Sequence, residues 1–139
     1  MLTRYRIERG VPAAALPKGM RQDTRKHTRH VLRPTAALVE AYLAAPGEGA
    51  WRRFADAYRA LLEKRFAAKR SAFDALAELA RRNDVHLGCN CPTQKNPEVR
   101  RCHTWLALEF FRERYPDLDV RMPHETRPGV GRAARARRG

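Results

Sequence analysis

The stretch from residue 81 to residue 90 decides the fold, and it reads RRNDVHLGCN. Its second half, 85–90, is a short apolar segment, and such a segment bounded by turn residues predicts a buried strand. Asn83 and Asp84 form the turn before it. A helical pattern precedes this turn and another follows the strand, and this alternation is typical of an α/β layer with parallel strands.

The segments on either side of this strand extend the same pattern. Three helices are expected before it: 36–45 with Thr35 as its cap, one carrying an aromatic stripe from Trp51 to Phe66, and a third from Ser71 to about Arg82. We interpret the aromatic stripe as core, because large apolar side chains at helical spacing are usually buried.

The ends of the chain add strands and one more helix. An opening strand is expected over 2–8, a loop over 10–19 and a short extended piece near 28–32. Pro97 begins a helix that ends at Tyr115, and 118–122 offers an edge strand. The sequence therefore predicts an α/β fold, a small three-layer domain with a short, mostly parallel sheet flanked by helices.

Size and hydropathy indicate one domain and no membrane span. The chain has 139 residues, and we expect a single α/β domain over 1–123, with a basic, loop-rich segment at 9–33. Residues 124–139 are expected to be a flexible, disordered Arg-rich tail. Neither a stretch of ~20 apolar residues nor a signal peptide is seen, so a cytoplasmic protein without membrane contact is expected.

The positive charge gathers at the two ends of the chain. The net charge is +14; residues 1–33 hold 9 basic and 2 acidic residues (+7), and residues 124–139 hold 5 and 1 (+4). Such ends are typical of arms that contact nucleic acid or another polyanion, although a solvated, compositionally biased end is an equally open explanation. The candidate nucleic-acid contacts are Arg21, Arg25, Lys26, Arg29, Arg132, Arg135, Arg137 and Arg138.

All three cysteines lie in one segment, which reads GCNCPTQKNPEVRRCH from Gly88 to His103. The strand assignment places Cys89 and Cys91 at the carboxyl end of a strand, and Cys102 and His103 in the first turns of the next helix. Open α/β sheets bind ligands at that edge, and helix N-termini attract anions and lower thiol pKa values. The candidate anion ligands there are Cys89, Asn90, Lys95, Arg100, Arg101 and Thr104.

Three interpretations of this segment stay open. Cys91 or Cys102 is a nucleophile with His103 as its base; or Cys89, Cys91, Cys102 and His103 hold zinc; or the cysteines are simply small buried side chains. The zinc alternative is weakened by the C-x-C spacing and by the adjacency of Cys102 and His103.

The segment order and the Gly88–Pro92 and Arg101–His103 motifs resemble the domain-of-unknown-function 488 family. The resemblance spans about 33–122 and implies a small α/β fold of the kind found in bacteria and archaea, without implying a general activity. Many members carry Arg after the Cys-His pair, where this chain has Thr104.

The leading hypothesis is a Cys/His anion-binding or active site at the strand edge, acting on a phosphate-bearing or nucleic-acid ligand. The alternative is a non-catalytic nucleic-acid-binding module that uses its basic ends, with the Cys/His cluster structural and zinc as its one candidate cofactor.

Overall fold

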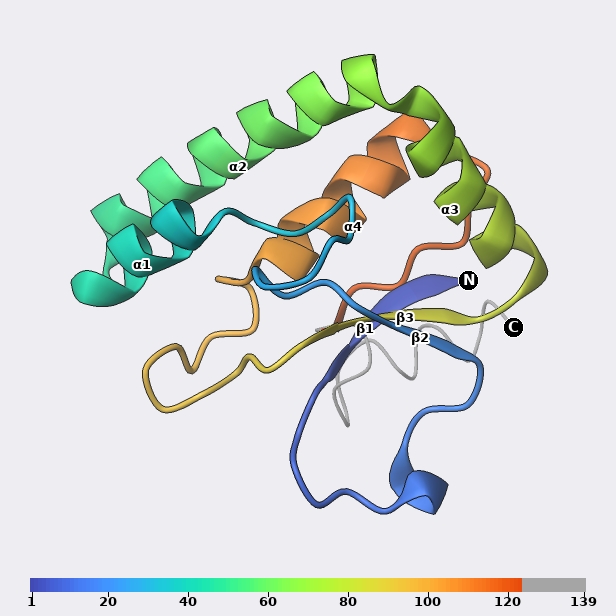
Figure 1. Ribbon diagram of the computed structural model, residues 1–139, viewed down its shortest axis with the longest axis horizontal. Coiled ribbons are helices and arrows are strands. Elements are labelled where there is room, and N and C mark those ends of the chain that lie inside the picture. Colours follow the sequence, from blue (N-terminus) through green and yellow to red (C-terminus); the bar gives the residue numbers. More distant parts are fainter. Residues whose placement is uncertain (124–139) are drawn as a thin grey trace, which may run out of the picture.

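The computed structural model describes residues 1–123 (Figure 1). Its elements in chain order are β1 (Leu2–Arg6), the 3-10 helix η1 (Ala13–Ala15), β2 (Met20–Asp23), α1 (Ala36–Ala44), α2 (Glu48–Ala68), α3 (Arg70–Arg82), β3 (Val85–Cys89) and α4 (His103–Arg114).

The sheet has three parallel strands in the order β1-β3-β2. The strand that the sequence makes most apolar, β3, therefore lies at the centre, with Leu2 on one side and Met20 on the other in register with Val85. Parallel pairing brings the carboxyl ends of all three strands to one edge, and Cys89 is the last residue of the central strand.

Helix α4 packs on the sheet, and α2 crosses over α4 in the next layer (Figure 1). An aromatic cluster fills the space where α2, α3 and α4 meet, and its members are Phe66, Phe73, Phe110, Phe111 and Tyr115. The predicted α/β fold with a short parallel sheet flanked by helices is confirmed.

Local sequence signals explain several element boundaries. The Thr35 hydroxyl accepts a hydrogen bond from the amide of Leu38 and so caps α1 as expected. Gly88 fits β3 closely, because a Cβ there would lie 2.8 Å from the Ile7 side chain and 2.9 Å from that of Tyr5 and would force both to move. The glycine lets these two side chains cover the central strand.

Two expected strands and one helix start differ from the structure. Residues 28–32 form turns, because Thr28 and His30 side chains bond to nearby main-chain groups and compete with sheet pairing. The second strand is instead β2. Residues 118–122 contribute only a single bridge, from Val120 to Leu2.

Helix α4 begins at His103 rather than near Pro97. Side-chain bonds from Asn96 hold the intervening loop in another conformation, as described below. The tail at 124–139, with Arg132, Arg135, Arg137 and Arg138, lies outside the described residues.

Candidate active site

Three thiols meet where β3 ends and α4 begins. The Sγ atoms of Cys89, Cys91 and Cys102 all lie within 4.8 Å of one another. Cys89 and Cys102 are buried, whereas Cys91 is partly exposed, and none of the three is in a disulfide. The two predicted segments are therefore brought together into one cluster.

Cys102 is the acceptor of this cluster. It occupies the N-cap position of α4, where the helix dipole favours a thiolate. The neighbouring thiols of Cys89 and Cys91, which share the negative charge, and then the adjacent His103 hold the pKa of the Cys102 thiol well below its usual value, although burial opposes this. The same sharing raises the pKa of Cys91 to about 11 and also raises that of Cys89. These opposite shifts favour Cys102 as the thiol of the cluster that ionises first.

The side chain of Thr104 adds a further donor to the same sulfur. Its Oγ1 lies 3.2 Å from Cys102 Sγ and accepts a hydrogen bond of 2.8 Å from Arg4 Nε. Arg4 also donates to the carbonyl of Cys91 at 2.7 Å. Thr104 is fully buried, so it contacts the Cys102 thiol from the interior of the protein. Arg4 places its guanidinium against Thr104, the residue that follows Cys102 and His103.

The orientation of His103 follows from its hydrogen bonds. Thr24 Oγ1 lies 3.0 Å from the carbonyl oxygen of Gly88, to which it donates, and 2.8 Å from His103 Nε2. Because the hydroxyl has one proton, it accepts from Nε2–H, and Nδ1 carries the lone pair. Nδ1 lies 3.8 Å from Cys102 Sγ. His103 is thus set to accept a proton from that thiol.

Asn96 fixes the loop that closes the cluster. Its buried side chain donates to Cys91 Sγ at 3.4 Å and to the carbonyl of Arg101 at 2.6 Å, and it accepts from the Tyr42 hydroxyl at 3.1 Å. These three bonds tie both ends of the loop to α1. They explain why the chain stays non-helical until His103.

The thiol cluster opens into a cavity of about 490 Å³, which we name the thiol cavity. One wall is aromatic, formed by Tyr42, Trp51 and Phe54 in successive ring contacts of 5.3 to 6.0 Å. The other residues that line it and matter here are Arg25, Lys26, Asn90, Lys95, Asn96, Arg101, His103 and the three cysteines.

Most cations of the thiol cavity already face a carboxylate. Arg25 forms an ion pair with Asp23 at 2.8 Å, Lys26 with Glu40 at 3.7 Å, and Arg101 with Glu48 at 2.9 Å. Within residues 1–123, Lys95 has no such partner. The cavity therefore offers one unpaired ammonium beside an aromatic wall and a sulfur cluster.

The three sulfurs also fit three corners of a zinc site. Thiolates around tetrahedral zinc stand about 3.8 Å apart, which the cluster meets with small adjustments. His103 does not belong to the group of ligand atoms that all lie within 4.8 Å, because its Nδ1 approaches Cys102 alone. The residues fit a zinc ion held by three thiols, with a fourth position left for an outside ligand.

Other expected site residues lie elsewhere. Arg100 faces a neighbouring hollow beside Trp105 and Glu109. Arg21 is exposed and donates to the carbonyl of Pro17, and Arg29 lines a different cavity. Four residues of the site were not predicted from the sequence: Arg4, Thr24, Tyr42 and Asn96. The one sequence signal for the aromatic wall was the helical spacing of aromatic residues near Trp51, which we interpreted as core.

Among residues 1–123, no helix is long and apolar enough to span a membrane.

A family model described as "Active DUF488-N3 subclade" matches residues 1–115. It covers every strand and helix and the whole thiol cavity. Neither the curated proteins nor the solved structures contain a match to the chain.

Proposed function

This chain belongs to the DUF488 family, and we propose that its thiol cavity binds a nucleotide-type, phosphate-bearing ligand and presents the Cys102 thiolate to it. The observation that carries the proposal is the composition of one cavity: an aromatic wall, cationic side chains and a sulfur cluster. Aromatic faces suit a nucleobase, and Lys95 with the N-terminus of α4 suits a phosphate.

The chemistry follows from the roles of two neighbouring residues. The Cys102 thiol gives its proton to His103 Nδ1, and the thiolate attacks an electrophilic atom of the bound ligand. A bond forms from Sγ to that atom as the bond to the leaving group breaks. The leaving group departs with the electron pair and takes the proton back from His103.

Alkylation kinetics test this proposal. We expect iodoacetamide at neutral pH to label Cys102 fastest, as located by mass spectrometry of peptides, because the thiolate is the nucleophile. We expect adenosine monophosphate to slow that labelling by filling the cavity. Cys91→Ser is the control for the position of the label, since it removes the partly exposed thiol and keeps the Thr104 and His103 contacts to Cys102. Uniformly slow thiols, or labelling that adenosine monophosphate leaves unchanged, contradict the proposal.

The close approach of the three sulfurs favours a second candidate, a structural zinc ion with nucleic-acid binding carried by the basic residues alone. It predicts one zinc per chain by elemental mass spectrometry and a melting temperature that a chelator lowers sharply. That result, together with thiols that do not react, would replace the thiolate proposal.

A further inference from the structure

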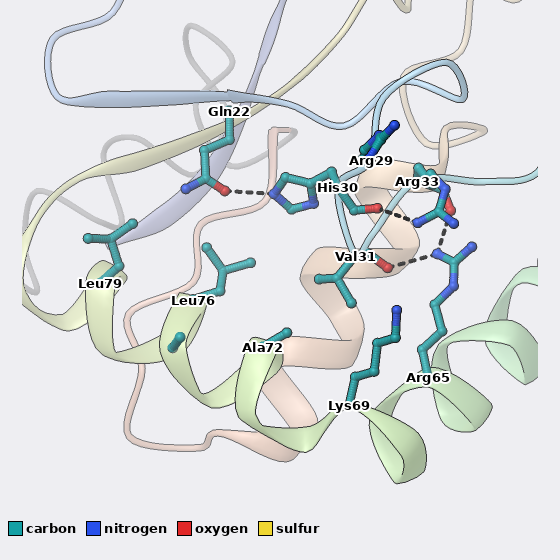
Figure 2. Close-up of a pocket in the computed structure, with 11 residues that line it drawn as sticks. Gln22, Arg29, His30, Val31, Arg33, Arg65, Lys69, Ala72, Leu76 and Leu79 are labelled. Carbon is teal, nitrogen blue, oxygen red and sulfur yellow. Dashed lines mark hydrogen bonds between the residues drawn. The ribbon is translucent and has the colours of Figure 1, made fainter.

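A second cavity, of about 430 Å³, lies between the segment that links β2 to α1 and the helices α2 and α3 (Figure 2). We name it the cationic cavity. Four basic side chains line it: Arg29 and Arg33 from the linking segment, Arg65 from α2, and Lys69 from the break between α2 and α3. Lys69 points upward from that break toward the linking segment in Figure 2.

No carboxylate compensates these charges. The lining includes no Asp or Glu, and none of the four cations forms an ion pair with an acidic residue in the described part of the chain. Uncompensated positive charge in a concave site focuses an attractive field on anions. The cationic cavity therefore attracts anions more strongly than the thiol cavity, whose cations are mostly paired.

Arg65 is held in place rather than free to turn away. Its Nη1 donates to the carbonyls of Val31 and Arg33, at 2.7 Å and 2.6 Å (Figure 2). Burial and then the like charge of Arg33 lower the pKa of Arg65. Two guanidinium groups fixed near each other repel, and a bound anion offsets that repulsion.

One segment walls both cavities. Arg25, Lys26 and Pro34 face the thiol cavity, while Arg29, His30 and Arg33 face the cationic cavity. A nucleic-acid backbone that runs from the aromatic wall across this segment would reach the unpaired cations of the cationic cavity. A free mononucleotide has no second phosphate linkage to place there.

We infer that the cationic cavity is a phosphodiester subsite, so that the ligand of the thiol cavity is a nucleotide within a single strand of nucleic acid. This inference rests on the proposed function. A single strand is favoured because stacking on Trp51, the partly exposed member of the aromatic wall, needs an unpaired base. The phosphodiester contact supplies affinity that depends on salt.

Paired charge variants test the subsite. Arg29→Gln with Lys69→Gln removes two exposed charges from the cationic cavity. Arg9→Gln with Lys64→Gln is the matched control, because both residues are exposed and line neither cavity. The probe is a fluorescein-labelled oligoadenylate of about twelve nucleotides, followed by anisotropy across a salt series.

We expect the oligoadenylate to bind the unchanged protein at least about 10-fold more tightly than adenosine monophosphate, given added phosphate contacts. The cavity variant should lose about 1.4 from the slope of log affinity against log salt, at about 0.7 per phosphate contact. The control should keep the slope, and both variants should keep the protection of Cys102 by adenosine monophosphate.

Two results overturn the subsite: equal slopes for the cavity variant and the control, or an oligomer that binds no more tightly than the mononucleotide. If adenosine monophosphate fails to protect Cys102 in the unchanged protein, the proposed function fails instead. The slope comparison still decides whether phosphates bind the cationic cavity.

Discussion

The thiol cavity and the cationic cavity share a wall but handle charge in opposite ways. In the thiol cavity, Arg25, Lys26 and Arg101 each face a carboxylate. In the cationic cavity, the four basic side chains have none within residues 1–123. The attraction of a site for anions therefore depends less on its number of basic residues than on how many of them are paired. The carboxylate of an ion pair cancels most of the electric field of its cation.

The two cavities also differ in what their buried polar groups organise. In the thiol cavity, side chains converge on one sulfur, that of Cys102. In the cationic cavity, Arg65 and His30 mainly hold the main chain of the linking segment. The first arrangement suits chemistry, and the second suits binding. Changes in either cavity should leave the other property intact.

The largest effect is expected from Cys102→Ser. A hydroxyl at this position cannot form the anion that the surrounding donors stabilise, so fast alkylation should fall at least about 100-fold. Oligoadenylate affinity should change less than about threefold, because the phosphate contacts are elsewhere. Circular dichroism melting checks that the variant is folded. A large loss of affinity in a folded variant would break the division between chemistry and binding.

The cationic cavity should make folding stability depend on pH. His30 Nε2 donates to Gln22 Oε1 at 2.6 Å, and its Nδ1 accepts from the amide of Leu32 at 3.1 Å, which is a neutral ring. Burial, and then the nearby His103, lower the pKa of His30 to about 4, with Arg33 adding to this and Asp23 opposing it.

The unfolded chain therefore takes up a proton at His30 before the folded chain does. Stability should be full above pH 6.5, the ordinary value, and should decrease as the pH falls toward 4, by about 2–3 kcal/mol in total. Urea unfolding across this range measures it. His30→Gln should flatten the dependence, and an unchanged slope in that variant would assign the effect to another group.

A smaller change is expected for Thr104→Val, which removes one donor from the Cys102 sulfur while keeping the shape of the side chain. Losing this hydrogen bond to the anion should raise the pKa of the Cys102 thiol, so the pH at which alkylation reaches half of its plateau rate should move upward while the plateau rate is kept. The pH profile of alkylation separates this from a structural effect. A profile that does not move would remove Thr104 from the support of the thiol.

The smallest effect is expected from Lys95→Gln, the one unpaired cation in the described thiol cavity. Because the ammonium is exposed, protection by adenosine monophosphate should weaken only about two- to fourfold. Lys64→Gln serves as the control and should have no effect. If Lys95→Gln also weakened oligoadenylate binding as much as Arg29→Gln with Lys69→Gln does, the two cavities would attract anions equally.

The elements of the fold could be predicted wherever they depend on residues that are neighbours in the sequence. The apolar stretch 85–89 predicts β3, and Thr35 predicts the start of α1, because each depends on residues close in the chain. The same logic placed the cysteines at the strand edge. The position of α4 was wrong because Asn96 bonds to Tyr42 of α1, a contact that no local pattern reveals.

The walls of both cavities were harder to predict for a related reason. Helical periodicity groups Trp51 and Phe54 with the buried face of α2, but it does not say that this end of the face stays open beside Cys91. Arg65 lies on a helix that carries many charges and Lys69 directly follows that helix, and only the tertiary structure brings them to Arg29 and Arg33. Residues that are far apart in the sequence, such as these four, cannot be grouped into one cavity without the tertiary structure.

The central place of β3 has a consequence for how the protein forms. The neighbouring strands β1 and β2 are separated from β3 in the sequence by three helices. Neither can pair with β3 until residues 85–89 have been synthesised and have reached the sheet. Helices close early, whereas such distant pairing is slow. The three thiols lie close together in the chain, but the sheet beside Cys89 is completed only by this distant pairing, so the cluster stays open to oxidation until the sheet closes. We expect refolding in the absence of a reductant to give chains with non-native disulfides, and refolding with a reductant to give the native cluster of free thiols.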